Sequence, residues 1–300
     1  MEVYDAFSYC GRSASFDGYG VFMKNLFYLI LIFTVTVSVF AQNADDFTFT
    51  VNTSENPQTI TITGYRGRKT QNLIFPEKIN NIPVVEISKG NFSYFNIETV
   101  FIPATITYID LGSRNGWISS HDFISYNVDP NNANYCSIDG VLFSKDQSIL
   151  LSFPMGKSIS EYTIPDTVTV IGKSAFVNSK YILSVVLPES LVAIKDSAFA
   201  GCAGLNEIII PNNVNVIGPY AFYGCRSLKS VKVSIVTNIY RIADIGKFAF
   251  GECTELEEIT IPSPYTLIGY GAFEYTYKLR NDIKEIIVEI FGERVFYEGK

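Results

Sequence analysis

Hydrophobic positions in the second half of the chain follow one repeating order. The clearest copy spans residues 194–216 and reads IKDSAFAGCAGLNEIIIPNNVNV, and the next copy begins at Ile217. Further copies begin at Ile171, Ile245 and Ile268. Self-similarity at a period of about 20–50 residues is typical of solenoids, in which each repeat forms one coil stacked on its neighbours. The pattern therefore predicts one elongated repeat domain.

Apolar spacing within one copy shows which part is a strand. Ile208 and Ile210 alternate with outward positions, as in a strand with one buried face, and Pro211 marks its end because proline lacks an N–H for the sheet. We expect Gly218 to form a tight corner without steric cost. The same glycine recurs as Gly172, Gly246 and Gly269. The SAFAGC-type segment is too short for an ordinary helix and predicts one helical or 3₁₀ turn with Phe199 inward.

The most hydrophobic segment precedes the repeats. A short positive start at Met23 leads into a 15-residue apolar stretch, 26–40, and then Ala41, which are the three parts of a secretory signal peptide. We predict a signal peptide at 23–41, cleavage after Ala41, and a secreted or cell-surface protein. An uncleaved membrane anchor is the alternative, although a transmembrane helix needs about 20 residues.

The remaining chain is divided by how well it keeps the repeat. Residues 1–22 are polar and rich in glycine, and we interpret them as a gene-model extension. We predict an N-terminal cap at 42–63, the solenoid at 64–290 with an irregular insertion at 112–160, and a C-terminal end piece at 291–300. Outside the clear repeats, strands are predicted at 46–51, 59–63, 123–128, 140–143, 149–153 and 283–288. A longer segment at 234–244 predicts a surface loop.

Charge and residue counts exclude several kinds of function. The net charge of −7 argues against a nucleic-acid or anionic-membrane partner, because phosphate binding needs a basic face. The chain has one histidine, His121, so a Ser-His-Asp or Cys-His site would have to use it, and an ordinary zinc site would lack ligands. We predict no enzyme activity, no catalytic or metal site and no cofactor, and contact with a membrane only through an uncleaved signal segment.

Three cysteines share one position of the repeat. Cys202, Cys225 and Cys253 recur in the same frame, where a small buried residue fits, and Cys136 lies outside it. A stacked column of free thiols is the preferred interpretation, and a disulfide between adjacent coils is the alternative in an oxidising compartment. The chain contains no C-x-x-C motif, so a redox or zinc-knuckle motif is excluded.

The repeat I-G-x-x-A-F-x-x-C-x-x-L-x-x-I-x-I-P resembles the BspA-like (Treponema pallidum-type) leucine-rich repeat family. Residues 194–273 match its motif closely, the segments at 82–87 and 137–154 also look like family elements, and Ser179 and Thr276 depart from it at the cysteine position. The resemblance implies a β-rich, right-handed leucine-rich-repeat coil, with a parallel sheet on one face and short helical or 3₁₀ turns on the other. It also implies an exported bacterial protein of a family associated with adhesion, without catalytic residues.

One outward position recurs between the two buried residues of each strand. These positions are Ile74, Phe101, Thr163, Val186, Ile209, Lys232, Thr260 and Ile287. Successive members should form a ladder across the sheet, and large apolar members would form an exposed patch. The candidate partner-binding face is Phe101, Thr163, Val186, Ile209, Lys232 and Thr260. The competing interpretation is that β-propensity alone selects branched residues there.

Two classes of function fit these patterns. The first is an exported, adhesin-like scaffold that binds a host matrix or bacterial surface protein through the solenoid. The second is a carbohydrate-binding protein or hydrolase that uses the 112–160 insertion, with Asp122, Asp129 and Asp139 as carboxylates. A pocket lined by two of these carboxylates would favour the second class.

Overall fold

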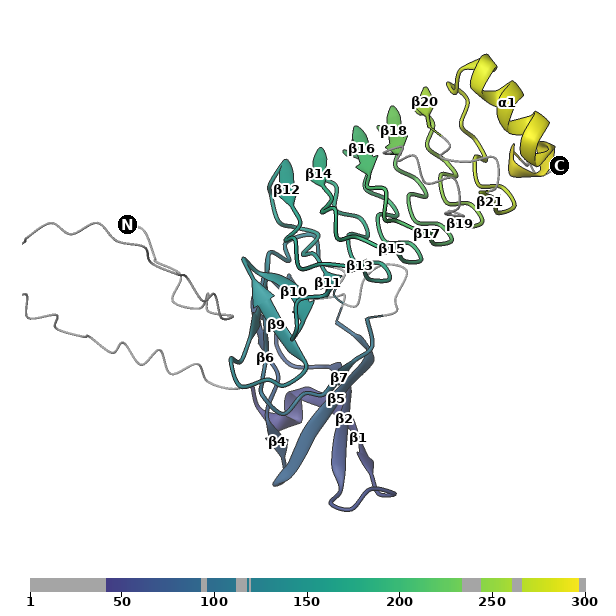
Figure 1. Ribbon diagram of the computed structural model, residues 1–300. Helices are drawn as coiled ribbons and strands as arrows, with labels where there is room; N and C mark the ends of the chain where they lie inside the picture. The colour runs from purple at the N-terminus through teal and green to yellow at the C-terminus, as the bar shows by residue number, and fades with distance from the viewer. Residues whose placement is uncertain are drawn as a thin grey trace, which may run out of the picture.

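The chain winds through a row of stacked coils. A computed structural model describes residues 42–92, 96–111, 118, 120–233, 244–260 and 266–296. The C-terminal coils run in a row from β12 (Glu161–Thr163) to the helix α1 (Asn281–Phe291) (Figure 1). The predicted β-rich repeat solenoid is thereby confirmed. The predicted extension and signal peptide lie outside the described residues, as does nearly all of the predicted loop at 234–244.

Each C-terminal coil contributes one strand to each of two parallel sheets. The front sheet consists of β12, β14 (Ser184–Val186), β16 (Glu207–Ile210), β18 (Ser230–Val233) and β20 (Glu258–Ile259). The side sheet contains β13 (Val170–Ile171), β15 (Ala193–Ile194), β17 (Val216–Ile217), β19 (Asp244–Ile245) and β21 (Leu267–Ile268). The sequence predicts only the front sheet. The side sheet arises because the first isoleucine of every repeat also lies in a short extended segment that pairs with the next coil.

Burial along the front strands follows the predicted alternation. In β16, Ile208 and Ile210 are buried while Glu207 and Ile209 are exposed. The strand ends before Pro211, as expected for a residue that cannot donate to a sheet. One face of the front sheet therefore covers the core, and the other faces solvent.

The N-terminal half also builds two sheets. After η1 (Ala44–Asp46), β1 (Phe47–Asn52) and β2 (Thr59–Tyr65) form an antiparallel hairpin near the predicted positions. In the same sheet, β2 pairs in parallel with β5 (Ile82–Asn91), which also pairs with β4 (Lys78–Ile79) and β7 (Tyr108–Ile109). The other sheet consists of three parallel strands, β3 (Asn72–Ile74), β6 (Thr99–Ile102) and β8 (Ser125–Val128).

The irregular insertion joins the two halves. Its strands β9 (Tyr135–Ile138), β10 (Val141–Ser144) and β11 (Ile149–Ser152) are antiparallel, and β11 continues into the side sheet by pairing with β13. The β10–β11 hairpin matches the prediction, whereas β9 is not predicted. Val141 and Phe143 of β10 pack in the C-terminal core, and Leu142 between them packs in the N-terminal core. This part of the insertion is therefore a structural rung between two cores.

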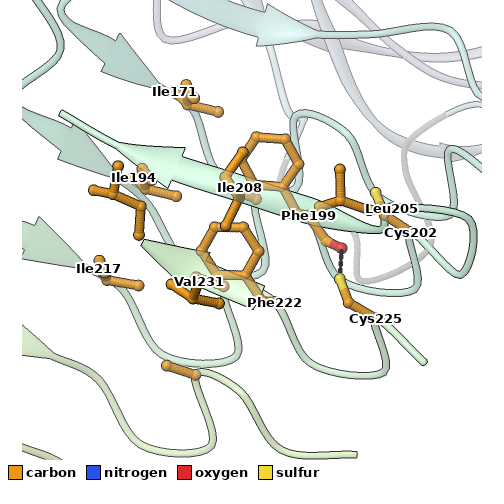
Figure 2. Packing of buried hydrophobic residues seen from close by; sticks show 14 of the residues in the cluster. Ile171, Ile194, Phe199, Cys202, Leu205, Ile208, Ile217, Phe222, Cys225 and Val231 are labelled. Atoms are coloured by element: carbon orange, nitrogen blue, oxygen red, sulfur yellow. Dashed lines mark hydrogen bonds between the residues drawn. The ribbon is translucent and has the colours of Figure 1, made fainter. Parts of the chain in front are cut away.

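A column of stacked phenylalanines forms the centre of the C-terminal core. Its described members are Phe153, Phe176, Phe199, Phe222, Phe250 and Phe273. The ring centroids of Phe199 and Phe222 are 5.1 Å apart with planes 4° apart, and both side chains are buried (Figure 2). The backbone stays in the same register, since Phe199 N–H donates to Ala221 O at 2.7 Å. The predicted alignment of Phe199, Phe222 and Phe250 is confirmed.

The segment that carries each phenylalanine is a series of turns, not a regular 3₁₀ helix. Ala200 N–H and Cys202 N–H each donate to the carbonyl three residues back. The N–H groups of Phe199 and Gly201 donate instead to carbonyls of the next coil, Ala221 O at 2.7 Å and Tyr223 O at 2.8 Å. The residues thus alternate between local turns and bonds that link the coils, so each turn also contributes to stacking.

The cysteines of the repeat link neighbouring coils through their thiols. Cys202, Cys225 and Cys253 are buried and free. Their Sγ atoms donate to the carbonyls of Phe176 (2.9 Å), Phe199 (3.2 Å) and Phe222 (3.2 Å), respectively. Figure 2 shows the bond between Cys225 and Phe199. A thiol suits this position because it is small, apolar and able to donate weakly to the carbonyl of the preceding coil.

The glycine that follows the isoleucines at 171, 217, 245 and 268 has a different role from the predicted corner. Gly172, Gly218, Gly246 and Gly269 are absent from the positive-φ residues of the described chain. A Cβ at Gly218 would lie 2.6 Å from Asp196 N, and one at Gly246 would overlap Pro219 N of the preceding coil. Glycine is therefore needed because the backbones of adjacent coils approach closely, not because the chain needs an unusual conformation.

We expect Gly246→Ala to lower the free energy of unfolding by about 1–3 kcal/mol, because the added methyl would force two backbones apart. Lys195→Ala is the matched control. Lys195 occupies the same frame position and already carries a side chain, so we expect a change within about 0.5 kcal/mol. Urea unfolding measures both variants. Equal stabilities of the two variants would contradict the close-approach explanation.

The last coil ends in a helix where a strand is predicted. Residues 283–288 lie within α1, so the predicted strand is wrong, and Ile287 is buried instead of facing outward. The positions of Ile283, Ile287 and Phe291 repeat every four residues, which suits a helix that packs one face against the core. A helix satisfies its own backbone, whereas a final strand would leave an unpaired edge.

The short helix η2 (Glu293–Phe296) completes the column after α1. Phe273 N–H donates to Val295 O at 2.8 Å, which continues the register of the earlier coils. The ring of Phe296 lies 5.7 Å from that of Phe273. Residues 294–296 therefore take the place of one further alanine-phenylalanine turn.

Candidate protein-binding face

Four of the predicted outward residues lie side by side on the front sheet. Thr163 is opposite Val186 across β12 and β14, and Ile209 is opposite Lys232 across β16 and β18. Ser184 is opposite Glu207, and the same parallel register places Val186 next to Ile209. All four side chains are exposed, which follows from the alternation of the strands.

The apolar part of this face is centred on β14 and β16. Val186 is 46% exposed and Ile209 is 55% exposed, both large values for aliphatic side chains. Leu183, just before β14, is 45% exposed. We call Leu183, Val186 and Ile209 the apolar patch. It is bordered by charged residues of the same sheet, including the exposed Glu207 and Lys232.

Leu183 is a member of the patch that the strand-based ladder misses. The residues at its frame position in the following coils are Asn206, Lys229, Glu257 and Arg280, and the backbones of these coils are bonded in that order. Leu183 can therefore be identified from the sequence, because it is the apolar residue at a frame position that is polar in the following coils. This position is exposed in the neighbouring coils as well, so Leu183 differs from its counterparts in being apolar.

The remaining predicted ladder residues do not join this row. Phe101 lies in the separate sheet of β3, β6 and β8, where its neighbours are Ile74 and Asn127, and it is half-buried. The ladder is interrupted because β9, β10 and β11 of the insertion join the side sheet. Thr260 follows β20 and is half-buried, with its N–H donating to Val231 O at 2.9 Å. Its place at the edge of the front sheet leaves it outside the apolar patch.

The carboxylates of the insertion lie on separate turns. Asp122 precedes β8, Asp129 follows it, and Asp139 lies between β9 and β10. Asp129 is engaged locally, because its Oδ1 accepts the N–H of Asn131 at 2.8 Å. A small cavity beside Phe123 and Tyr126 is lined by none of the three. The arrangement therefore offers no geometric support for a sugar or hydrolase site built from these aspartates.

The single histidine and the acidic groups give no sign of a metal centre. His121 is exposed in a turn. Within the described ranges, no cluster of three or more His, Cys, Asp or Glu side chains could hold a metal ion. None of the helices in those ranges has the length and apolar character required to cross a bilayer.

Comparison with known proteins places these coils in a family. The sequence profile of the BspA type leucine rich repeat region matches six copies, at residues 37–114, 151–280 and 235–300. These matches cover well over half of the chain, and they coincide with the stacked coils. The chain belongs to the BspA-type leucine-rich repeat family. The resemblance in the repeat motif is thereby confirmed, and membership is consistent with a protein-interaction role.

Three solved structures illustrate what the chain is similar to. A leucine-rich repeat protein from Eubacterium ventriosum is 25% identical with a TM-score of 0.58, over 69% of this chain and 54% of that one. The chain thus spans about half the length of that relative. The leucine rich repeat protein of T. pallidum is 20% identical with a TM-score of 0.43, over 86% of this chain and 97% of the other. The pneumococcal vaccine antigen PcpA is 16% identical with a TM-score of 0.44, over 85% and 98%. No curated protein matches significantly.

Proposed function

We propose that this BspA-type protein is an exported, adhesin-like scaffold that binds a host matrix or bacterial surface protein through the apolar patch of the front sheet. The observation that carries the proposal is that Val186 and Ile209 are neighbours on adjacent strands and about half exposed, with the similarly exposed Leu183 just before β14. Contiguous exposed aliphatic residues on a soluble surface mark interaction sites more often than isolated ones do.

The surroundings of the patch suit a protein partner. Protein interfaces combine an apolar centre with a polar rim, and here Glu207 and Lys232 flank Ile209 on its own and the next strand. The strands beneath are fixed by parallel pairing on both sides and by the phenylalanine column. A rigid platform loses little conformational entropy on binding, which favours affinity.

The double variant Val186→Glu, Ile209→Glu tests the proposed face. We expect it to weaken binding to a partner captured from host-matrix or bacterial-surface extracts by at least about tenfold, because two central apolar contacts become buried charges. Surface plasmon resonance with the purified partner measures the change.

Val192→Glu, Leu267→Glu is the matched control for that experiment. These residues are 40% and 63% exposed but belong to the side-sheet region of their coils. The control should bind like the wild type. Unchanged affinity in the folded Val186→Glu, Ile209→Glu variant would contradict the proposed face.

Export is proposed from the predicted signal peptide at 23–41. Cleavage after Ala41 would leave Gln42 as the first residue, and Gln42 Oε1 accepts Ile74 N–H at 3.1 Å. We expect mass spectrometry of the exported protein to find an N-terminal peptide that starts at Gln42. Recovery of peptides from residues 1–22 in that protein would contradict the assigned start at Met23.

A further inference from the structure

A second feature lies on the turn side of the coils, among residues that take no part in the apolar patch. It is a groove of about 500 Å³, within the range of small-ligand sites. Its lining includes the small residues Ala200, Gly201 and Gly224 and the larger Tyr220 and Tyr223. The groove spans residues of four consecutive coils, or about 14 Å at the spacing of paired strands.

Unequal side chains at equivalent frame positions create the groove. The position of Tyr220 holds Ser174 and Ser197 in the two preceding coils, and that of Tyr223 holds Val177 and Ala200. Two large tyrosine side chains therefore project next to the small residues of the preceding coils. A Cβ at Gly224 would have no neighbour closer than 3.9 Å, so space remains open above this glycine.

Tyr220 occupies a backbone conformation that is unusual for a large residue. Its φ is +58°, and Phe248 at the same frame position has a φ of +53°. Left-handed conformations are uncommon for bulky residues. The same conformation occurs at Ser174, Ser197 and Gly271 in the other described coils, so it belongs to the repeat. The solenoid tolerates two aromatic residues here although serine or glycine occupies this position in the other described coils.

The aromatic rings beside the groove are held in fixed orientations. Tyr220 stacks on Phe248 with centroids 5.2 Å apart, and Tyr223 meets Tyr220 edge to face at 5.6 Å. Lys247 Nζ lies 5.8 Å from the centroid of Tyr220. Fixed rings offer a preorganised apolar surface to a flat ligand.

Planar polar groups lie next to these rings. Tyr223 Oη donates to Glu252 Oε1 at 2.6 Å, and Arg226 Nη2 donates to Glu252 Oε2 at 3.0 Å. These bonds lower the pKa of Glu252, and the carboxylate raises the pKa of Tyr223 to about 12, so Glu252 is ionised and Tyr223 protonated at neutral pH. Arg226 and Glu252 balance each other's charge, which disfavours a strongly charged ligand.

The backbone at the groove is already paired between coils. Asn178 N–H donates to Ala200 O, Gly201 N–H to Tyr223 O, and Gly224 N–H to Gly251 O, each at 2.8 Å. A peptide that binds by adding a strand needs unpaired backbone groups, and these are occupied. Recognition here must rely on the aromatic rings and the planar polar side chains.

We propose that this groove binds a short neutral oligosaccharide, with a sugar ring against Tyr220 and Tyr223 and its hydroxyls hydrogen-bonded to Arg226 and Glu252. The C–H face of a pyranose is apolar and flat enough to stack on an aromatic ring. Adjacent hydroxyls act as donor and acceptor, which matches a carboxylate next to a guanidinium. This site is independent of the proposed protein-binding face and of the aspartates in the insertion.

Saturation-transfer NMR on the purified chain tests the site with four neutral trisaccharides, namely cellotriose, maltotriose, laminaritriose and chitotriose. We expect at least one to bind, and Tyr220→Ala to weaken its affinity by about tenfold through loss of the stacking surface. Glu252→Gln should also lower the affinity for the same sugar. Ile209→Glu, which alters only the protein-binding face, should leave sugar binding unchanged.

A variant that fills the groove keeps the test decisive if Tyr220→Ala does not fold. Ala203 is exposed and lines the groove, so Ala203→Trp should block the sugar without disturbing the core. Circular dichroism verifies that each variant is folded. The proposal is overturned if none of the four sugars binds, if binding survives Ala203→Trp, or if a heparin disaccharide binds more tightly than every neutral sugar.

Discussion

Phe222→Ala is expected to lower the free energy of unfolding by about 3–5 kcal/mol. The Phe222 ring is fully buried between Phe199, at 5.1 Å, and Phe250, at 5.2 Å, so its removal leaves a cavity with aromatic walls on both sides. A domain of ordinary stability has only about 5–15 kcal/mol in total. Because each coil contacts only its neighbours, the loss also weakens the link between the coils before and after it.

Tyr181→Ala is the matched control for the column. Tyr181 is 41% exposed and contacts Lys180, whose Nζ lies 4.8 Å from the ring centroid. We expect this variant to change stability by less than about 1 kcal/mol. Urea unfolding followed by circular dichroism compares the two. Equal losses for both variants would contradict the role of the column.

The repeat thiols are expected to react at least about 10³-fold more slowly with iodoacetamide in the folded chain than in guanidinium, at about pH 8. Burial raises the pKa of Cys202 to about 12 and also raises the pKa of Cys225 and Cys253. The reactive thiolate is therefore scarce, and the reagent reaches the sulfur only when the coils open. Peptide mapping by mass spectrometry measures labelling at each site.

An introduced thiol beside the column provides the control for this measurement. Ala203 directly follows Cys202 and is exposed, so Ala203→Cys should be labelled rapidly in the folded chain. A higher pH should speed up its labelling, because an exposed thiol ordinarily has a pKa of about 8.5 and the thiolate is the form that reacts. Labelling of Cys202 as fast as that of the introduced thiol would contradict the buried column.

The repeat frame predicts the centre of the fold because each copy repeats both a pattern and its packing. The apolar positions of one coil meet the same positions of the next, so Phe199, Phe222 and Phe250 align once the frame is known. The ends of the column are harder to predict. Phe153 and Phe296 join it although their surroundings in the sequence have lost the motif.

Features that depend on what lies next to a coil escape a prediction made from the repeat frame alone. The segment 283–288 has an apolar spacing compatible with both strand and helix, and in the structure Ile283, Ile287 and Phe291 pack against the core from one face of a helix. The repeated glycine is read as a corner from one coil, whereas its cause is the neighbouring coil. The ladder likewise assumes one continuous sheet, and the insertion separates Phe101 from Val186.

The groove on the turn side could be found only by comparing coils with one another. Tyr220 replaces serine at its frame position, which is visible in the sequence, but the hollow depends on the small residues of the preceding coil. The same comparison identifies Leu183 just before β14. Deviations from the repeat therefore mark the candidate sites more clearly than the repeat itself does.

Site-specific photocrosslinking tests the proposed protein-binding face most directly. Benzoylphenylalanine is placed at position 209 in the centre of the apolar patch, and at position 192 on the side-sheet region as the control. We predict that position 209 crosslinks to one defined partner protein from the extracts used for capture and that position 192 does not. Crosslinking to that partner from position 192 alone would contradict the proposed face.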